Sequence, residues 1–248
     1  MLKALGPDLG REVTWVASEP PRLDEGLGAV FAETPNIHKW LHYLPVYEEA
    51  LARSTPIRLL EIGVARGGSL QMWRRYLHPD SVLVGIDIDP TTERFDDPER
   101  HIHVRLGSQT DNAFLQRVVD EFGPFDVILD DGSHLNSHIV RTFQYLFLHG
   151  LKSGGVYIVE DIAANYWRPY RDVRMSFPDF TKWLIDAMHA HYQEKRAEIF
   201  FRAGDPKRAP AVRVPLATTL VEKIEFHDAI AVIRRADGQR SLPVSVFQ

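Results

Sequence analysis

Short runs of apolar residues alternate through the middle of the chain with segments in which apolar residues recur every three or four positions. Unbroken runs are typical of strands buried on both faces, and the wider spacing is typical of amphipathic helices. We predict strands at 58–62, 82–88, 102–106, 125–129 and 156–159, and helices at 69–76, 111–122 and 136–149. Because strands that alternate with helices pair in parallel through right-handed crossovers, this pattern predicts an α/β fold with a mostly parallel sheet and helices on both faces.

Two shorter strands near the C-terminus, at 223–226 and 229–235, flank His227 and Asp228. Their close spacing predicts an antiparallel hairpin, which brings the expected sheet to seven strands. Before this hairpin, residues 179–199 predict one long helix, and residues 204–215 are rich in proline and arginine and predict a surface loop. The helix carries an apolar stripe that is more typical of core or interface packing than of a cofactor site: Trp183, Leu184, Ala187, Met188 and His191.

The N-terminal part is irregular up to residues 38–52, whose partly helical pattern contains Pro45. We expect a helix, a kink at this proline and a second helix. The chain therefore divides into an N-terminal irregular and helical segment at 1–56, which would cover the site, and a single structural unit at 57–248.

Composition excludes several classes of protein. Of the 248 residues, 44% are hydrophobic and 25% are charged, which is ordinary for a globular protein with a full core. A net charge of −5 without a basic stripe argues against nucleic acid as a partner. The chain has no apolar stretch of membrane-spanning length and no cysteine. We expect a cytoplasmic enzyme with neither nucleic acid nor membrane as a partner.

A glycine-rich turn follows the first predicted strand, and it is the strongest indication of a ligand. The spacing of Gly63, Gly67 and Gly68 departs from the G-x-G-x-x-G of dinucleotide folds, and Glu61 is unsuited to a pyrophosphate. A carboxylate suits the ammonium, sulfonium and ribose of S-adenosylmethionine (SAM), although a tight turn without a ligand also selects glycine. The candidate cofactor contacts in this loop are Glu61, Gly63, Val64, Gly67 and Ser69.

Polar residues that could contact a cofactor also follow the second and third predicted strands. Asp87, followed by Ile88, lies where an acid binds ribose hydroxyls in related folds. Ser108 and Gln109 could face an adenine edge or could be ordinary loop residues, and Asp111 could cap the following helix.

Acidic residues gather after the fourth and fifth strands, with a histidine close by. Asp130 is expected to be structural or to touch the cofactor, whereas Asp131, Glu160 and Asp161 would repel one another unless a cation compensated them. Oxygen ligands of this kind suit Mg²⁺. His134 could then serve as a base beside the metal or could cap the next helix.

Together these segments resemble the class I SAM- and Mg²⁺-dependent sugar O-methyltransferases of macrolide biosynthesis, such as the mycinamicin and demethylmacrocin enzymes. The resemblance rests on the segment 37–43 with Tyr47, and on the segments 60–73, 85–90, 130–134, 160–161 and 183–186. The chain is also similar to the 1-O-methyltransferase of methylmannose polysaccharide synthesis. The resemblance implies a Rossmann-like class I methyltransferase fold, metal on Asp131, Glu160 and Asp161, and His134 as the general base.

The resemblance also places the acceptor sugar near His42, Tyr43, Tyr166 and Trp167. Two departures bear on the acceptor: only residues 1–57 precede the first predicted strand, and Ala163-Ala164-Asn165 stands where the family has threonine and serine before Tyr-Trp. They favour a small sugar or mannoside over a macrolide. We expect methylation of a sugar or glycoside hydroxyl by a homo-oligomer, with a dimer as the simplest case.

Other functions fit the same motifs. The chain could be related to the proteins called cephalosporin hydroxylases, or it could be a nicotinamide oxidoreductase, although the glycine spacing opposes the latter. It could also be a SAM- or metal-binding protein without catalysis.

Overall fold

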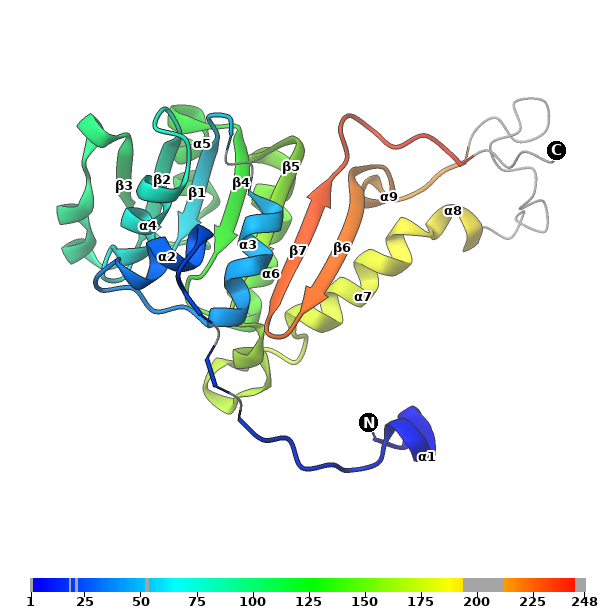
Figure 1. Ribbon diagram of the computed structural model, residues 1–248. Coiled ribbons are helices and arrows are strands. Elements are labelled where there is room, and N and C mark those ends of the chain that lie inside the picture. Colours follow the sequence, from blue (N-terminus) through cyan, green and yellow to red (C-terminus); the bar gives the residue numbers. More distant parts are fainter. Residues whose placement is uncertain (1, 18, 21, 52–53, 194–211, 244–248) are drawn as a thin grey trace.

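A seven-stranded sheet forms the centre of the computed structural model, which describes residues 2–17, 19–20, 22–51, 54–193 and 212–243 (Figure 1). The strand order is β3-β2-β1-β4-β5-β7-β6. The first five strands pair in parallel, and β7 is antiparallel to both β5 and β6, which confirms the predicted fold class. The strands are β1 (Arg58–Ile62), β2 (Val82–Asp87), β3 (Ile102–Leu106), β4 (Phe125–Asp130), β5 (Leu151–Val159), β6 (Val221–His227) and β7 (Ile230–Arg235).

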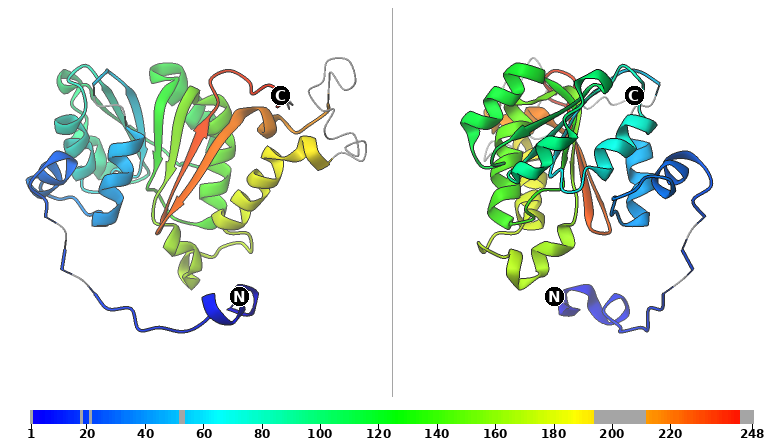
Figure 2. Two further views of the ribbon diagram at one scale, coloured as in Figure 1. Left: turned by 45° about the vertical axis from the view of Figure 1, so that its right-hand side comes forward. Right: turned by 90° about the vertical axis from the view of Figure 1, so that its left-hand side faces the viewer.

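Helices cover both faces of this sheet (Figure 2). Successive residues of a strand point to opposite faces, and both faces are apolar here: Leu59 belongs to one core cluster and Leu60 to the other. One face packs on α2 (Gly26–Ala32), α3 (Leu44–Ala50) and α4 (Gly68–Tyr76). The other packs on α5 (Asn112–Phe122), α6 (Asn136–His149) and α7 (Phe177–Met188). The shorter helices are α1 (Gly6–Leu9), α8 (Ala190–Gln193) and α9 (Leu216–Leu220).

Local sequence signals explain where several helices begin. The carboxylate of Asp111 accepts bonds from the backbone N–H groups of Ala113 and Phe114, so it caps α5 as predicted. Ser176 and Asp179 form a capping box at the start of α7.

The structure corrects the prediction for residues 38–52. Instead of a kinked pair of helices, a short 3₁₀ turn at Leu41–Tyr43 leads into α3, and Pro45 lies in the first turn of that helix. A proline is tolerated there because the first N–H groups of a helix have no partner within the helix. Pro45 therefore starts a helix rather than bending one.

The predicted long helix at 179–199 is also wrong in its extent. It breaks at His189, whose N–H bonds to the carbonyl of Asp186 and whose ring nitrogen lies 2.8 Å from the carbonyl oxygen of Ile185. A side chain that bonds to the helix backbone in this way competes with continuation of the helix. Leu184 and His191 of the predicted stripe are buried, but Trp183 is 63% exposed.

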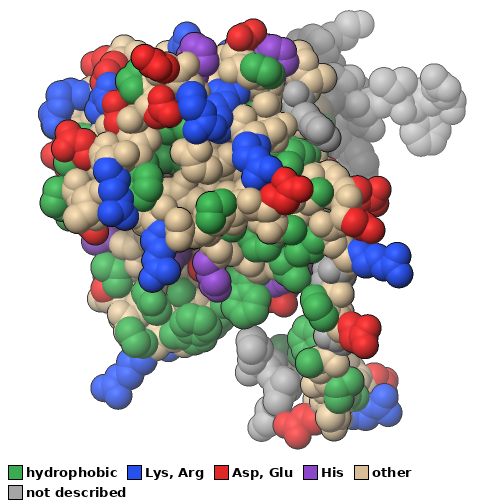
Figure 3. Space-filling view, turned by 60° about the vertical axis from the view of Figure 1, so that its left-hand side comes forward, with side chains coloured by type: hydrophobic (Ala, Val, Ile, Leu, Met, Phe, Trp, Pro, Cys, Tyr) green, Lys and Arg blue, Asp and Glu red, His purple; other side chains and the backbone are tan. Residues whose placement is uncertain are grey.

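Smaller differences complete the comparison. β5 begins at Leu151 rather than Val156, and residues 204–211 of the predicted surface loop lie outside the described residues. In the described part of the chain, none of the helices combines the length and apolar character needed to span a membrane. Figure 3 shows acidic and basic side chains intermixed on the visible face. The division into units at 1–56 and 57–248 stays a prediction.

Candidate active site

The predicted site residues converge at the C-terminal ends of the parallel strands. The loops that follow β1, β2, β4 and β5 lie at this end, with the β6–β7 turn and the segment that precedes α3 (Figure 1). Two cavities open there, of about 410 and 370 Å³, and they share lining residues that include Gly63, Ala65, Asp131 and Gly132. Their combined size is that of a pocket for a cofactor and a small acceptor.

The glycine-rich turn approaches other backbone so closely that side chains cannot replace two of its glycines. Gly63 has φ +94°, and a Cβ there would lie 2.2 Å from the carbonyl oxygen of Asp131. Gly67 has φ +72°, and a Cβ there would lie 2.6 Å from the ring of Phe95. Glycine is therefore required by torsion and by space at both positions.

Asp87 holds this turn in place. One oxygen of its carboxylate accepts bonds from the N–H groups of Val64 and Ala65, at 2.8 and 3.0 Å. Asp87 also lines the second cavity beside Ile88, whose side chain is 75% exposed. An acid next to an exposed apolar side chain suits a ribose next to an adenine ring.

Glu61 is completely buried, with none of its surface exposed to solvent. It accepts bonds from the hydroxyl of Ser69 at 2.8 Å and from the indole N–H of Trp73 at 3.3 Å. Burial raises the pKa of Glu61 to about 7, and the positive charge of Lys39 opposes that shift. Its predicted contact with the cofactor stays a prediction.

Gln109 and Asp130 bond to each other inside the protein. The amide of Gln109 donates to Asp130 and to Thr142, and its oxygen accepts from the N–H of Ser133. Burial raises the pKa of Asp130 to about 7. Ser108 lines the second cavity, and its hydroxyl lies 3.0 Å from that of Thr110. Gln109 also lines the second cavity, so the predicted contact of Gln109 and Asp130 with the cofactor stays a prediction beside the structural alternative.

Asp131, His134 and Asp161 form the candidate metal centre. Their ligand atoms all lie within 4.8 Å of one another, and the ring nitrogen Nε2 of His134 is 3.9 Å from a carboxylate oxygen of each acid. His134 and Asp161 both have positive φ, +57° and +51°, which is uncommon for residues other than glycine. Such backbone strain is frequent at functional sites.

Glu160, the third predicted metal ligand, is paired with a lysine that sequence reasoning did not single out. The ammonium of Lys39 lies 2.8 Å from a carboxylate oxygen of Glu160 and 2.6 Å from one of Asp131. Burial opposes the charged form of Lys39, but the two carboxylates outweigh it and raise its pKa. The only available signal was its place in the segment 37–43, on which the resemblance to a known family partly rests.

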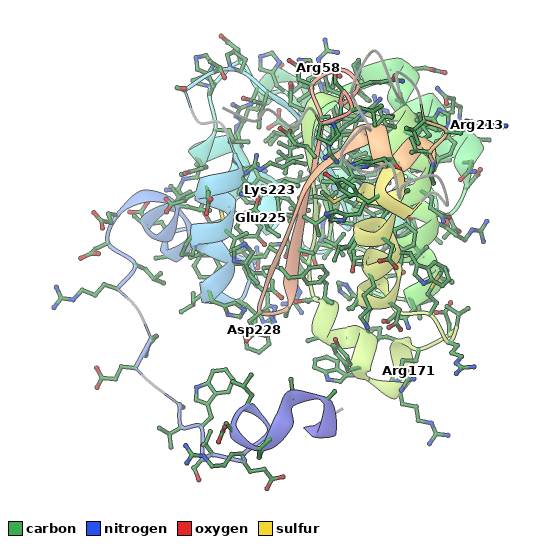
Figure 4. The ribbon with its side chains drawn as sticks, turned by 90° about the vertical axis from the view of Figure 1, so that its right-hand side faces the viewer. Arg58, Arg171, Arg213, Lys223, Glu225 and Asp228 are labelled. Atoms are coloured by element: carbon green, nitrogen blue, oxygen red, sulfur yellow. The ribbon has the colours of Figure 1, made fainter. Side chains whose placement is uncertain are left out.

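The predicted acceptor residues lie around this centre. Tyr43 is buried, and its hydroxyl is 2.9 Å from a carboxylate oxygen of Asp161. His42 bonds to the backbone oxygen of Asp228 at the tip of the β6–β7 hairpin (Figure 4). Tyr166 and Trp167 are 67% and 54% exposed.

The loop that carries these two aromatic residues also approaches the candidate base. The ring of Tyr170 packs edge-on against His134, with ring centroids 6.0 Å apart. Arg171 points away from the body of the molecule from the same loop (Figure 4).

A known family model matches the central part of the chain. Residues 60–162 match a family model described as a methyltransferase domain. Residues 60–162 thus resemble a methyltransferase domain. This domain runs from β1 past the end of β5, so it includes the glycine-rich turn and all the acids of the candidate centre.

Curated relatives of the chain are named as O-methyltransferases. The chain is 35% identical over 214 residues to the 8-demethyl-8-α-L-rhamnosyl tetracenomycin-C 2′-O-methyltransferase of Streptomyces olivaceus, a match that covers 79% of this chain and 51% of that protein. It is also 35% identical to the mycinamicin VI 2″-O-methyltransferase of Micromonospora griseorubida, over 78% of this chain and 48% of the relative. The chain spans about half the length of these relatives.

A solved structure agrees with these matches. The MycE methyltransferase of the mycinamycin biosynthetic pathway, in complex with Mg and SAH, is 27% identical with a TM-score of 0.69, covering 88% of this chain and 55% of that one. The predicted resemblance to the macrolide sugar O-methyltransferases is confirmed. The similarity to the methylmannose enzyme stays a prediction.

Proposed function

We propose that this methyltransferase moves the methyl group of SAM to a hydroxyl of a sugar or small glycoside, with Mg²⁺ at the acids and His134 as the base. The observation that carries the proposal is the position of Asp131, which lines both cavities and also belongs to the cluster with His134 and Asp161. SAM that extends from the second cavity into the first, and an acceptor in the first cavity, would thus meet at this cluster.

The second cavity fits the adenosine half of SAM. Asp87 offers a carboxylate oxygen toward ribose hydroxyls, and Ile88 and Ser108 line the space where the base would lie. The glycine-rich turn continues into the first cavity, where Gly63, Val64 and Ser69 would surround the methionine half. The whole binding edge lies at the strand ends, where open α/β sheets bind their ligands.

The donor set fits a hard divalent cation. Asp131 and Asp161 supply carboxylate oxygens from two neighbouring loops, Glu160 lies beside them, and Mg²⁺ prefers oxygen ligands. When bound, Mg²⁺ supplies a positive charge that makes a nearby sugar hydroxyl more acidic and helps to orient it.

His134 is placed to take the proton from that hydroxyl. Its Nε2 lies 3.9 Å from a carboxylate oxygen of Asp131 and of Asp161, so a hydroxyl held beside these acids would be within reach of the imidazole. General-base assistance typically contributes about a hundred- to ten-thousand-fold in rate. Tyr170 limits the orientation of the imidazole through its edge-on contact.

The acceptor would lie between this centre and the exposed aromatic side chains Tyr166 and Trp167. Flat aromatic faces suit the C–H faces of a pyranose, and the named relatives methylate sugars of antibiotics. We favour a small sugar or mannoside as acceptor. A dimeric state and a cytoplasmic location stay predictions.

A mass-spectrometric screen tests the proposed function. Purified protein is incubated with SAM, Mg²⁺ and panels of rhamnosides, mannosides and macrolide glycosides, and each acceptor is examined for the gain of one methyl group. Methylation of a sugar hydroxyl in any panel is the expected result. Calorimetry with SAM and with NAD separates this function from an oxidoreductase, and SAM binding without any transfer would favour the non-catalytic alternative.

A further inference from the structure

The ammonium of Lys39 occupies the space between two of the proposed metal ligands. It lies 2.6 Å from Asp131 Oδ2 and 3.0 and 2.8 Å from the two oxygens of Glu160. Lys39 is 8% exposed and Glu160 is 1% exposed, so neither charge is well solvated. Lysine is rarely buried to this extent unless it is paired.

The segment that carries Lys39 reaches every acid of the candidate centre. Lys39 contacts Asp131 and Glu160, and Tyr43, a few residues further, contacts Asp161. The same segment rests on the cofactor turn, because a Cβ on Gly68 would lie 2.5 Å from the backbone oxygen of Asn36. It therefore connects the cofactor turn to the acids.

Charge balance gives this contact a consequence for metal binding. Within the described part of the chain, Lys39 is the one lysine or arginine that forms an ion pair with Asp131, Glu160 or Asp161. A divalent cation on the same oxygens would be a like charge beside the ammonium, at a distance where such repulsion is strong in a partly buried site.

We propose that Lys39 is a positioning residue that serves as a built-in counter-ion: it holds Asp131 and Glu160 together in the metal-free protein and competes with the divalent metal for their oxygens. The inference rests on the proposed metal site. Lys39 also lines the first cavity, so its flexible side chain has space into which its ammonium can turn when metal enters. The lysine thereby weakens metal binding while it keeps the acids in position.

Metal titration of the full chain tests the competition without any acceptor. We would measure the Kd for Mn²⁺ by electron paramagnetic resonance in wild type, in Lys39→Met and in Lys39→Arg, which keeps the charge. Lys152→Met is the matched control, because Lys152 is an exposed lysine paired with Asp126 near the start of β4, whereas the acids lie at the ends of β4 and β5. Loss of one nearby positive charge should tighten Mn²⁺ binding by about tenfold or more in Lys39→Met. Lys39→Arg should remain closer to wild type, and Lys152→Met should not change.

The outcomes separate this inference from the proposed function. If wild type binds Mn²⁺ and a folded Lys39→Met binds it no more tightly, the competition is wrong while the metal-dependent reaction stands. If neither protein binds Mn²⁺, both are overturned. If Lys39→Met does not fold, lysine NMR of wild type decides: Mg²⁺ should shift the side-chain signal of Lys39 and leave that of Lys152 unchanged, and an unmoved Lys39 signal contradicts the proposal.

Discussion

The imidazole of His134 lies at equal distance, 3.9 Å, from carboxylate oxygens of Asp131 and Asp161. The left-handed backbone conformation at His134 turns the chain sharply between β4 and α6 and directs the ring toward these acids. Histidine exchanges protons readily near neutral pH, which suits it to general-base work. His138 differs, because its ring nitrogen Nδ1 lies 2.8 Å from the hydroxyl of Ser133 and it lines the second cavity.

This difference gives a prediction for turnover. His134→Ala should lower kcat by about a hundredfold or more, because proton removal loses its base, and the loss should shrink at high pH. SAM and metal should still bind. Turnover measured against pH in both single variants checks this, with a smaller loss expected for His138→Ala. An active His134→Ala beside an inactive His138→Ala would transfer the role to His138.

Asp87 has two tasks at the residue scale, since it fastens the glycine-rich turn and faces the second cavity. Asp87→Ala should weaken SAM binding by about 1 to 3 kcal/mol, because it leaves the N–H groups of Val64 and Ala65 in the turn without their acceptor. Isothermal calorimetry measures the change. Asp111→Ala is the control: it removes the cap of α5 and should lower stability by about 1 kcal/mol without altering SAM affinity. Equal SAM affinity in wild type and Asp87→Ala would exclude Asp87 from the site.

The buried carboxyl group of Asp130 should make the stability of the fold depend on pH. Burial raises its pKa from the ordinary 3.8 to about 7, so below 3.8 the folded and unfolded chains both carry the proton. As the pH rises from there to about 7, the unfolded chain releases this proton more readily, and the folded state loses stability. Asp130→Asn removes this contribution.

Denaturant unfolding at pH 4 and pH 8 tests the effect. The free energy of unfolding should fall by about 3 kcal/mol more in wild type than in Asp130→Asn over this interval. Other buried acids, such as Glu61, contribute equally to both proteins and cancel in the difference. An identical pH dependence in the two proteins would contradict the buried, protonated state of Asp130.

Site residues could be predicted from the sequence where a polar or acidic side chain directly follows a predicted parallel strand. Acids at the ends of parallel strands, such as Asp131 and Asp161, must lie near each other once the sheet is parallel. Lys39 was missed because lysine normally lies on the surface, and nothing local signals that the chain folds back over β4 and β5. The inward turn of Gln109 depends equally on a distant partner, Thr142 on α6.

At the scale of elements, the turn between β1 and α4 is the part of the fold on which the site depends most. Gly63→Ala should lower the free energy of unfolding by about 1 to 3 kcal/mol and should impair SAM binding. Alanine is strained at this positive φ, and its Cβ would collide with the backbone of Asp131, the residue that follows β4. Gly154→Ala is the matched control: φ is also positive, at +74°, but the nearest atom is 3.8 Å away. Thermal unfolding measures the loss of stability in both variants, and calorimetry measures their SAM affinity. Gly154→Ala reports the cost of backbone strain alone, whereas Gly63→Ala adds a steric clash to that strain. Equal effects of the two substitutions would contradict the close packing of the turn.

Strands and helices were predictable to different degrees. β1 and β3 have the predicted bounds because each strand is followed directly by a glycine, Gly63 after β1 and Gly107 after β3. The break after α7 was not predictable, because it depends on a bond from the ring of His189 to the backbone, and Pro45 was read as a kink although it begins α3. Both errors concern helix ends, where short-range bonds compete with helix propensity.

At the scale of the whole molecule, the sheet brings together cofactor turn, acids and base, while the N-terminal segment closes over them through Lys39 and Tyr43. This arrangement was predictable as a fold class from the alternation of strands and helices. We expected the N-terminal segment to cover the site, but its individual contacts were not predictable, because they join residues far apart in the sequence, such as Lys39 and Asp131, which are 92 positions apart.

The most direct test of the central claim is the metal dependence of methyl transfer. Transfer from isotope-labelled SAM to an accepted glycoside would be followed by mass spectrometry after exhaustive chelation, and again after Mg²⁺ or Mn²⁺ is added back. The account predicts no transfer in the chelated protein and recovery with either metal, because both accept the oxygen ligands of Asp131, Glu160 and Asp161. Full transfer in the chelated protein would contradict it.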